Sequence, residues 1–175
     1  MTQSNTLSNC LIKRRDFLFS TATAITLTTL PVLGLGEVQA QVGRHTRTPL
    51  ARLGDLKIHQ PLYFDYPQKG AYSQCMLIKL GQAAGLGIGP DQDIVAFSLT
   101  CTHMGGNLRG TYQSNNASLG PCPLHLSSFD LTRHGILITG NATQSLPQIV
   151  LELDAETIVA RGVLGLVYGH QSNPV

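Results

Sequence analysis

Apolar residues beyond position 70 gather in short runs, each bounded by glycine, proline or small polar residues. Runs of this kind, when they are β-branched or alternate with polar residues, are typical of β-strands. They predict strands at 75–80, 94–99, 129–131, 136–139, 149–153, 157–160 and 163–168. Residues 154–156 (DAE) predict a hairpin turn between the strands at 149–153 and 157–160.

No segment beyond residue 40 has the periodicity of an amphipathic helix. Residues 81–90 (GQAAGLGIGP) hold too many glycines for a stable helix, and residues 41–49 predict an irregular lead-in. Residues 113–118 (QSNNAS) are mostly polar and predict a surface loop. The pattern as a whole therefore predicts an all-β fold of short antiparallel strands.

Length and composition suit one compact domain, or two at most, with many turns. The chain has 175 residues, of which 42% are hydrophobic, together with 18 glycines and 9 prolines. Its formal net charge is only +2. So small a charge gives no reason to expect nucleic acid or an anionic membrane as a partner.

The first forty residues have the features of an export signal. Arg14 and Arg15 form a twin-arginine pair, a mildly apolar stretch follows, and Val38-Gln39-Ala40 suits an A-x-A-type cleavage site. We therefore expect residues 1–40 to be a twin-arginine leader and residues 41–175 to form the mature periplasmic domain. The apolar stretch is rich in Ser and Thr and contains Pro31, so we expect no stable membrane span after cleavage. A leader that is retained as an anchor is the alternative.

Two short motifs combine cysteine with histidine. Cys101-Thr-His103 is followed, after eighteen residues, by Cys122-Pro-Leu-His125. Each motif offers one thiolate and one imidazole, and each adjoins a predicted strand. Two thiolates and two imidazoles suit either a [2Fe–2S] cluster with unequal ligands on its two irons or a tetrahedral Zn²⁺ ion.

The residues beside the motifs favour the iron–sulfur cluster over zinc. Gly105 and Gly106 allow the backbone to approach bridging sulfides closely, and Pro123 stiffens the second loop. Ser127 offers a hydroxyl that would donate a hydrogen bond to the cluster and raise its reduction potential. A structural zinc module requires none of these features.

The two motifs, CTHMGG and CPLHLS, resemble the ligand loops of the Rieske family. This resemblance implies a fold of three antiparallel sheets with a small cluster-binding subdomain, here about 96–146, and one [2Fe–2S] cluster per chain. It implies that Cys101, His103, Cys122 and His125 are the iron ligands and that residues 140–147 form a third, proline-bearing loop over the cluster.

Two departures from the family pattern are visible at the motifs. Rieske proteins of respiratory complexes join their ligand loops by a disulfide, whereas the corresponding positions here are Gly106 and Leu124. The family's tyrosine that donates to a ligand sulfur is here Phe129. Because hydrogen bonds to sulfur raise the potential, we expect a value below that of quinol-oxidising complexes.

Within the family, the leader, both loops and the tail of the chain are most similar to small subunits of arsenite oxidases. This likeness implies a large partner subunit with a molybdenum–pterin cofactor, where the substrate reacts. It also implies a periplasmic cytochrome c or azurin-like acceptor for the electrons. The Rieske subunit of a quinol–cytochrome c complex and the ferredoxin of a ring-hydroxylating dioxygenase are the alternative functions.

Overall fold

The computed structural model describes residues 45–170 and residue 173. The chain divides into two units, residues 1–43 and 44–175, and every described residue belongs to the second. The expected twin-arginine leader, residues 1–40, lies outside the described residues. Within the described part, no helix has the length and apolar character needed to cross a membrane.

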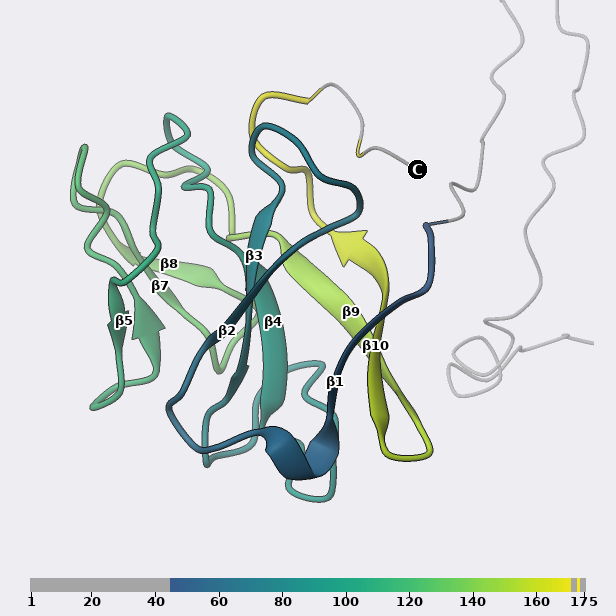
Figure 1. Cartoon of the computed structure of the whole chain (residues 1–175). Helices are drawn as coiled ribbons and strands as arrows, with labels where there is room; N and C mark the ends of the chain where they lie inside the picture. The colour runs from purple at the N-terminus through teal and green to yellow at the C-terminus, as the bar shows by residue number, and fades with distance from the viewer. Residues whose placement is uncertain (1–44, 171–172, 174–175) are drawn as a thin grey trace, which may run out of the picture. The chain divides into compact units, whose positions relative to one another are not determined.

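The described residues form two antiparallel sheets (Figure 1). The larger sheet has six strands in the order β1-β10-β9-β4-β3-β2, and the smaller has four in the order β5-β6-β7-β8. The large sheet comprises β1 (Thr48–Arg52), β2 (Leu62–Asp65), β3 (Gln74–Lys79), β4 (Ile94–Ser98), β9 (Gln148–Asp154) and β10 (Thr157–Leu164), with a 3-10 turn, η1 (Leu53–Asp55), after β1. The small sheet comprises β5 (Tyr112–Gln113), β6 (Ser118–Leu119), β7 (Ser128–Asp130) and β8 (Ile136–Thr139). The all-β antiparallel fold predicted from the sequence is thus confirmed.

The six-stranded sheet consists of two three-stranded halves that meet at one short contact. Strands β4 and β9 pair only through Ala96 with Ile149 and Phe97 with Gln148. The family resemblance implied three sheets; here this short ladder joins two of them, so the backbone hydrogen bonds define two sheets. The segment between β4 and β9 forms the four-stranded sheet and the loops around it, which lie to one side of the large sheet in Figure 1.

Consecutive residues of strands β3 and β4 are buried. Since successive side chains of a strand point to opposite sides, both faces of these strands are covered. Cys75 and Leu77 of β3 enter one core, which they share with the inner residues of β9 and β10. Met76 and Ile78 enter a second core, which continues into the four-stranded sheet and includes both motif cysteines. The central strands thus connect the base of the domain directly to the candidate metal site.

Most predicted strands are present with small differences at their ends. The segments 75–80, 94–99, 136–139, 149–153 and 129–131 match β3, β4, β8, β9 and β7 within one or two residues. The predicted hairpin turn is also present, because Asp154 pairs with Thr157 across it and Ala155 adopts a φ of 51°. Residues 81–90 form turns and no helix, as expected.

Three sequence predictions require correction. The separate strand at 163–168 is wrong, because β10 continues through a register shift between Ala160 and Gly162 and ends at Leu164. The lead-in at 41–49 ends in a strand, since Thr48 opens β1 and pairs with Ala160. The loop at 113–118 is shorter than predicted, because Gln113 and Ser118 pair with each other. Strand β1 pairs with a strand that is distant in the sequence, and β5 and β6 are only two residues long, so neither case gives a periodic signal.

Cys75 is a free, buried thiol in the core between the two halves of the large sheet. Its side chain is 2% exposed and its sulfur lies 3.3 Å from the carbonyl oxygen of Ser73. Burial is the main cause that raises the pKa of this thiol from 9.0 to about 12. The neutral thiol is therefore the form that the folded protein favours.

We predict that the free energy of unfolding falls as the pH rises from about 9 to about 12. Over this range the unfolded chain releases the Cys75 proton while the folded chain retains it, which corresponds to at most ~4 kcal/mol. Urea unfolding at several pH values measures the slope. The variant Cys75→Val should show a shallower slope above pH 9, with a remainder from Tyr66, whose pKa burial raises to about 12. Equal slopes in both proteins would contradict this account.

Candidate metal centre

The two ligand loops, which we define as 101–106 and 122–127, have the same backbone hydrogen bonds. In the first, the Cys101 N–H donates to the Gly106 carbonyl at 2.8 Å, and the Gly105 N–H donates to the Cys101 carbonyl at 2.9 Å. In the second, Cys122 donates to Ser127 at 2.8 Å and Leu126 donates to Cys122 at 2.9 Å. Each cysteine therefore begins a tight loop that closes five residues later.

The same position in each loop has a left-handed backbone. Gly105 has a φ of 70° and Leu126 a φ of 62°, and each is the fourth residue after its cysteine. Glycine adopts this conformation readily, but a leucine does so at a cost of roughly 1–2 kcal/mol. The surrounding contacts therefore hold the second loop in a conformation that its own sequence disfavours.

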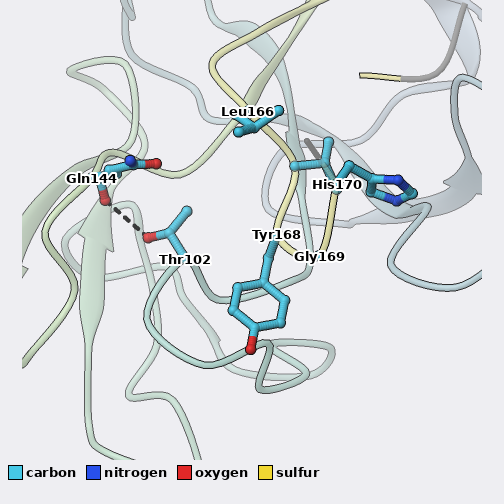
Figure 2. A pocket seen from close by; sticks show the side chains of 7 residues that line it. Thr102, Gln144, Leu166, Tyr168, Gly169 and His170 are labelled. Atoms are coloured by element: carbon cyan, nitrogen blue, oxygen red, sulfur yellow. Dashed lines mark hydrogen bonds between the residues drawn. The ribbon is translucent and has the colours of Figure 1, made fainter. Parts of the chain in front are cut away.

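The third loop (140–147) connects the two ligand loops. The Thr102 hydroxyl donates to the Gln144 carbonyl at 2.9 Å, and this bond is drawn in Figure 2. On the other side, the backbone N–H groups of Asn141 and Ala142 donate to the Ser127 Oγ at 3.2 and 3.3 Å. The third loop is thus bonded to one residue in each ligand loop.

The four candidate ligands are arranged as a pair of thiols and a pair of imidazoles. Cys101 and Cys122 are 1% and 2% exposed, and their side chains are neighbours. The rings of His103 and His125 lie 4.6 Å apart, edge to face. Burial, and then the neighbouring Cys122, raise the pKa of the Cys101 thiol. The thiols therefore face the protein interior while the imidazoles lie nearer the surface.

This arrangement fits a cluster of two irons with unequal ligands. The Nδ1 atom of His103 is buried and has no hydrogen-bond partner among the described residues, so its lone pair is available to a metal. Among those residues, no group of three His, Cys, Asp or Glu side chains converges as a single metal ion requires. Two sulfurs at one end and two nitrogens at the other match the ligand set of a Rieske [2Fe–2S] centre.

Comparisons with known proteins agree with this geometry. The sequence profile of the Rieske [2Fe-2S] domain matches residues 69–150. The chain is 48% identical over 162 residues to the iodate reductase subunit IdrB of Denitromonas iodatirespirans, covering 93% of this chain and 86% of that protein. It is 50% identical over 164 residues to the subunit of the same name from Pseudomonas sp. (strain SCT), covering 93% and 84%. The chain belongs to the Rieske family.

A solved structure supports the same fold. The soluble domain of Rieske protein II from Sulfolobus acidocaldarius superposes with a TM-score of 0.60 at 22% sequence identity, covering 74% of this chain and 83% of that one. At this identity the likeness concerns the fold alone. The family assignment itself establishes a Rieske-type [2Fe–2S] cluster as the cofactor of this chain.

In this Rieske protein, Gly106 and Leu124 stand at the two positions where related proteins have the disulfide cysteines, and they pack against each other. A Cβ atom at Gly106 would lie 3.2 Å from Cδ1 of Leu124 and 2.6 Å from the Cys122 sulfur. The Leu124 side chain therefore occupies the space that a side chain at 106 would need. Phe129, which replaces the family's tyrosine, is fully buried in the core beneath the loops.

The surface around the two histidines is apolar. Met104, Leu124 and Leu126 are 56%, 55% and 65% exposed, and neither ligand loop contains a charged residue. Exposed leucine and methionine side chains grouped in this way are typical of a surface that a partner covers. We call these three residues the apolar tip.

Sequence reasoning did not single out several residues that hold the centre in place. Thr102 and Gln144 connect two loops, and their bond joins residues 42 positions apart, which no local pattern reveals. Tyr168 was assigned to a strand, whereas it lies in a turn with its ring against Gly105. The one sequence feature that pointed to the contact with Tyr168 was the pair of glycines after His103. A glycine has no side chain, so another group can approach its backbone closely.

We predict that Cys101→Ala, Cys122→Ala, His103→Ala and His125→Ala each lose the bound iron. Removing any one ligand leaves an iron without a full donor set. The variant Cys75→Ala is the matched control, since it removes a buried thiol from the other core and should retain iron. Iron analysis and electron paramagnetic resonance of the reduced protein measure the result. A ligand variant with full iron and an unchanged spectrum would remove that residue from the ligand set.

The exchange of nitrogen for sulfur gives a second test of the histidines. His103→Cys or His125→Cys should lower the potential by roughly 200 mV or more in any protein that keeps its cluster, because a third thiolate makes the core more negative. Protein-film voltammetry measures the shift. The exposed His134 is the control position: His134→Cys should leave the potential unchanged.

We predict that Ser127→Ala lowers the reduction potential by roughly 50 mV. A hydrogen bond contributes about 1 kcal/mol, and for a one-electron couple this free energy corresponds to roughly 50 mV. The Ser127 oxygen already accepts two backbone N–H groups, so its own proton is free to be donated to the cluster. Ser128→Ala, one residue away in β7, is the control and should not shift the potential. If both variants behave alike, Ser127 has no role as a donor.

Proposed function

We propose that this chain is the electron-transfer subunit of a molybdenum–pterin oxidoreductase, in which Cys101, His103, Cys122 and His125 hold the cluster. The observation that carries the proposal is the identity of 48–50% to iodate reductase subunits over 93% of the chain. A Rieske cluster accepts and releases one electron at a time. The chain itself supplies a fixed ligand set and a surface at which a partner can approach it.

The burial of the ligands favours electron passage at the histidine side. The cysteine sulfurs are covered by core residues, whereas His125 is exposed and His103 is half-buried. Electron transfer requires close approach, and the imidazole edges are the parts of the centre nearest to solvent. The apolar tip around them suits a stable contact with a large subunit, since apolar area is what permanent interfaces bury.

The substrate of the large subunit has two candidates. Reduction of iodate is supported by the names of the relatives, and in that case electrons would pass from a donor through this chain to the molybdenum centre. Oxidation of arsenite to arsenate is supported by the likeness of the ligand loops and tail to arsenite oxidase small subunits. In that case electrons would flow in the opposite direction, to a cytochrome c or an azurin-like copper protein.

A location in the periplasm completes the proposal. The twin-arginine motif at Arg14-Arg15 suits a protein whose cofactor is inserted before export. A cytochrome c or azurin-like partner would be available in the same compartment. Sequencing of the mature N-terminus tests this part: a chain that begins near Gln41 supports export with cleavage.

Purification of the native assembly through a tag on this chain tests the proposed function. We expect a larger subunit, molybdenum and iron in the preparation. Dye-linked assays with iodate as oxidant and arsenite as reductant then identify the substrate. A chain that always purifies alone, or an assembly without molybdenum, would contradict the proposal.

The variant Cys101→Ala provides the control for electron transfer through this chain. In the assembly it should leave the molybdenum content unchanged and slow electron exchange with a cytochrome c by at least tenfold. Exchange at the normal rate would show that electrons bypass the Rieske subunit.

A further inference from the structure

The segment that follows β10 returns to the first ligand loop. Gly105, two residues after His103, has a φ of 70°, and a Cβ atom there would lie 2.6 Å from Cε1 of the Tyr168 ring. The ring therefore rests against the bare backbone of the loop. This contact joins the C-terminal part of the chain to Gly105, the first of the two glycines that follow His103.

A second tyrosine supports the first from behind. The rings of Tyr72 and Tyr168 lie 5.4 Å apart at an interplanar angle of 81°, an edge-to-face arrangement that is favourable for aromatic pairs. A Cβ atom at Gly169 would lie 2.8 Å from Cε2 of Tyr72, so this approach also depends on a glycine. The Tyr72 carbonyl accepts a hydrogen bond from the Thr100 hydroxyl at 3.3 Å, directly before Cys101.

The C-terminal segment has its own hydrogen bonds. Asn173 donates from Nδ2 to the Gly165 carbonyl at 2.7 Å and accepts the Val167 N–H at its Oδ1 at 2.9 Å. Val167 is 4% exposed. Figure 2 shows the segment opposite Thr102 and Gln144, across a cavity of about 160 Å³. Tyr168 is therefore presented to the ligand loop by a segment that is itself fixed.

We propose that Tyr168 is a positioning residue of the cluster site, which, with Tyr72 behind it, holds the first ligand loop in its closed conformation. The two loops differ in their support. The second loop is bonded at Ser127 by two backbone N–H groups, whereas the first has one hydroxyl bond to the third loop, from Thr102. Aromatic packing on Gly105 supplies the support that the first loop would otherwise lack in the absence of a loop disulfide.

This proposal rests on the ligand set given above and does not depend on the partner subunit. If the proposal holds, the Tyr168 ring slows the opening of the first loop and therefore slows the loss of iron. The hydroxyl of Tyr168 has no part in this effect. Because the ring touches the loop between His103 and Gly106, it also fixes the orientation of the His103 backbone. Removing the ring should therefore change the spectrum of the cluster as well as its lifetime.

The test compares three variants of the full chain with its cluster bound. In Tyr168→Ala we expect iron to be lost to a chelator roughly tenfold faster than in the wild type, since an aromatic contact of this kind is removed. We also expect altered g values in the electron paramagnetic resonance spectrum of the reduced protein. Tyr168→Phe keeps the ring and should restore both properties. Leu164→Ala, in the same part of the chain but without a ring against the ligand loop, should match the wild type.

The outcomes separate the proposal from its alternatives. Equal iron-loss rates and spectra for Tyr168→Ala and Leu164→Ala would overturn it, and so would a Tyr168→Phe variant that behaves like Tyr168→Ala. If Tyr168→Ala retains no cluster, Tyr72→Ala gives the decisive measurement, because it removes the supporting ring without exposing Gly105. A wild-type rate in Tyr72→Ala would then contradict the paired arrangement. None of these readouts involves a partner or a substrate, so failure of the proposed function leaves them unaffected.

Discussion

The structure depends on keeping two ligand loops fixed relative to each other without a covalent link. A cluster with two sulfur and two nitrogen ligands requires that both loops present their side chains at once, so any relative movement exposes the metal site. In this chain the loops share one backbone conformation, and the third loop is bonded to both. Each bond is worth only about 1 kcal/mol, so the arrangement is held by several weak contacts acting together.

These contacts are effective because the loops stand on a rigid base. Strand β4 is buried along its whole length and leads directly to Cys101, and Phe129 in β7 fills the core below Cys122. Both cysteines belong to the same hydrophobic core as β3 and β4. Burial of the thiols therefore follows from the packing of the base, while the histidines extend beyond the core and reach the surface.

Several features of the molecule could be predicted from the sequence because they are encoded locally. The strand at 136–139 is a short, mostly β-branched run, and the ligand types at Cys101 and His103 stand only two positions apart in the sequence. The family resemblance added the three-loop architecture. The features that were missed are contacts between distant segments: β1 pairs with β10, and Thr102 bonds to Gln144. No local periodicity reports such pairings, since they depend on how the whole sheet closes.

The same reasoning explains the error at 163–168. The short apolar run there suggested a separate strand, but the register shift after Ala160 lets β10 run on to Leu164. Gly165, with a φ of 91°, then turns the chain out of the sheet. This turn is what carries Tyr168 to the ligand loop, so the misjudged segment is the one that supports the metal site.

Charged residues are absent from the ligand loops themselves but form ion pairs on the large sheet. Arg47, Glu152, Asp154 and Arg161 form a network of exposed ion pairs on β9, β10 and the segment before β1. The apolar tip, by contrast, lies in loops without a charged residue. The three side chains of the tip would offer a partner shape and apolar contact, and they carry no charge of their own for long-range attraction. Such a surface suits a partner that stays bound, whereas one that must exchange rapidly would gain more from a charged surface.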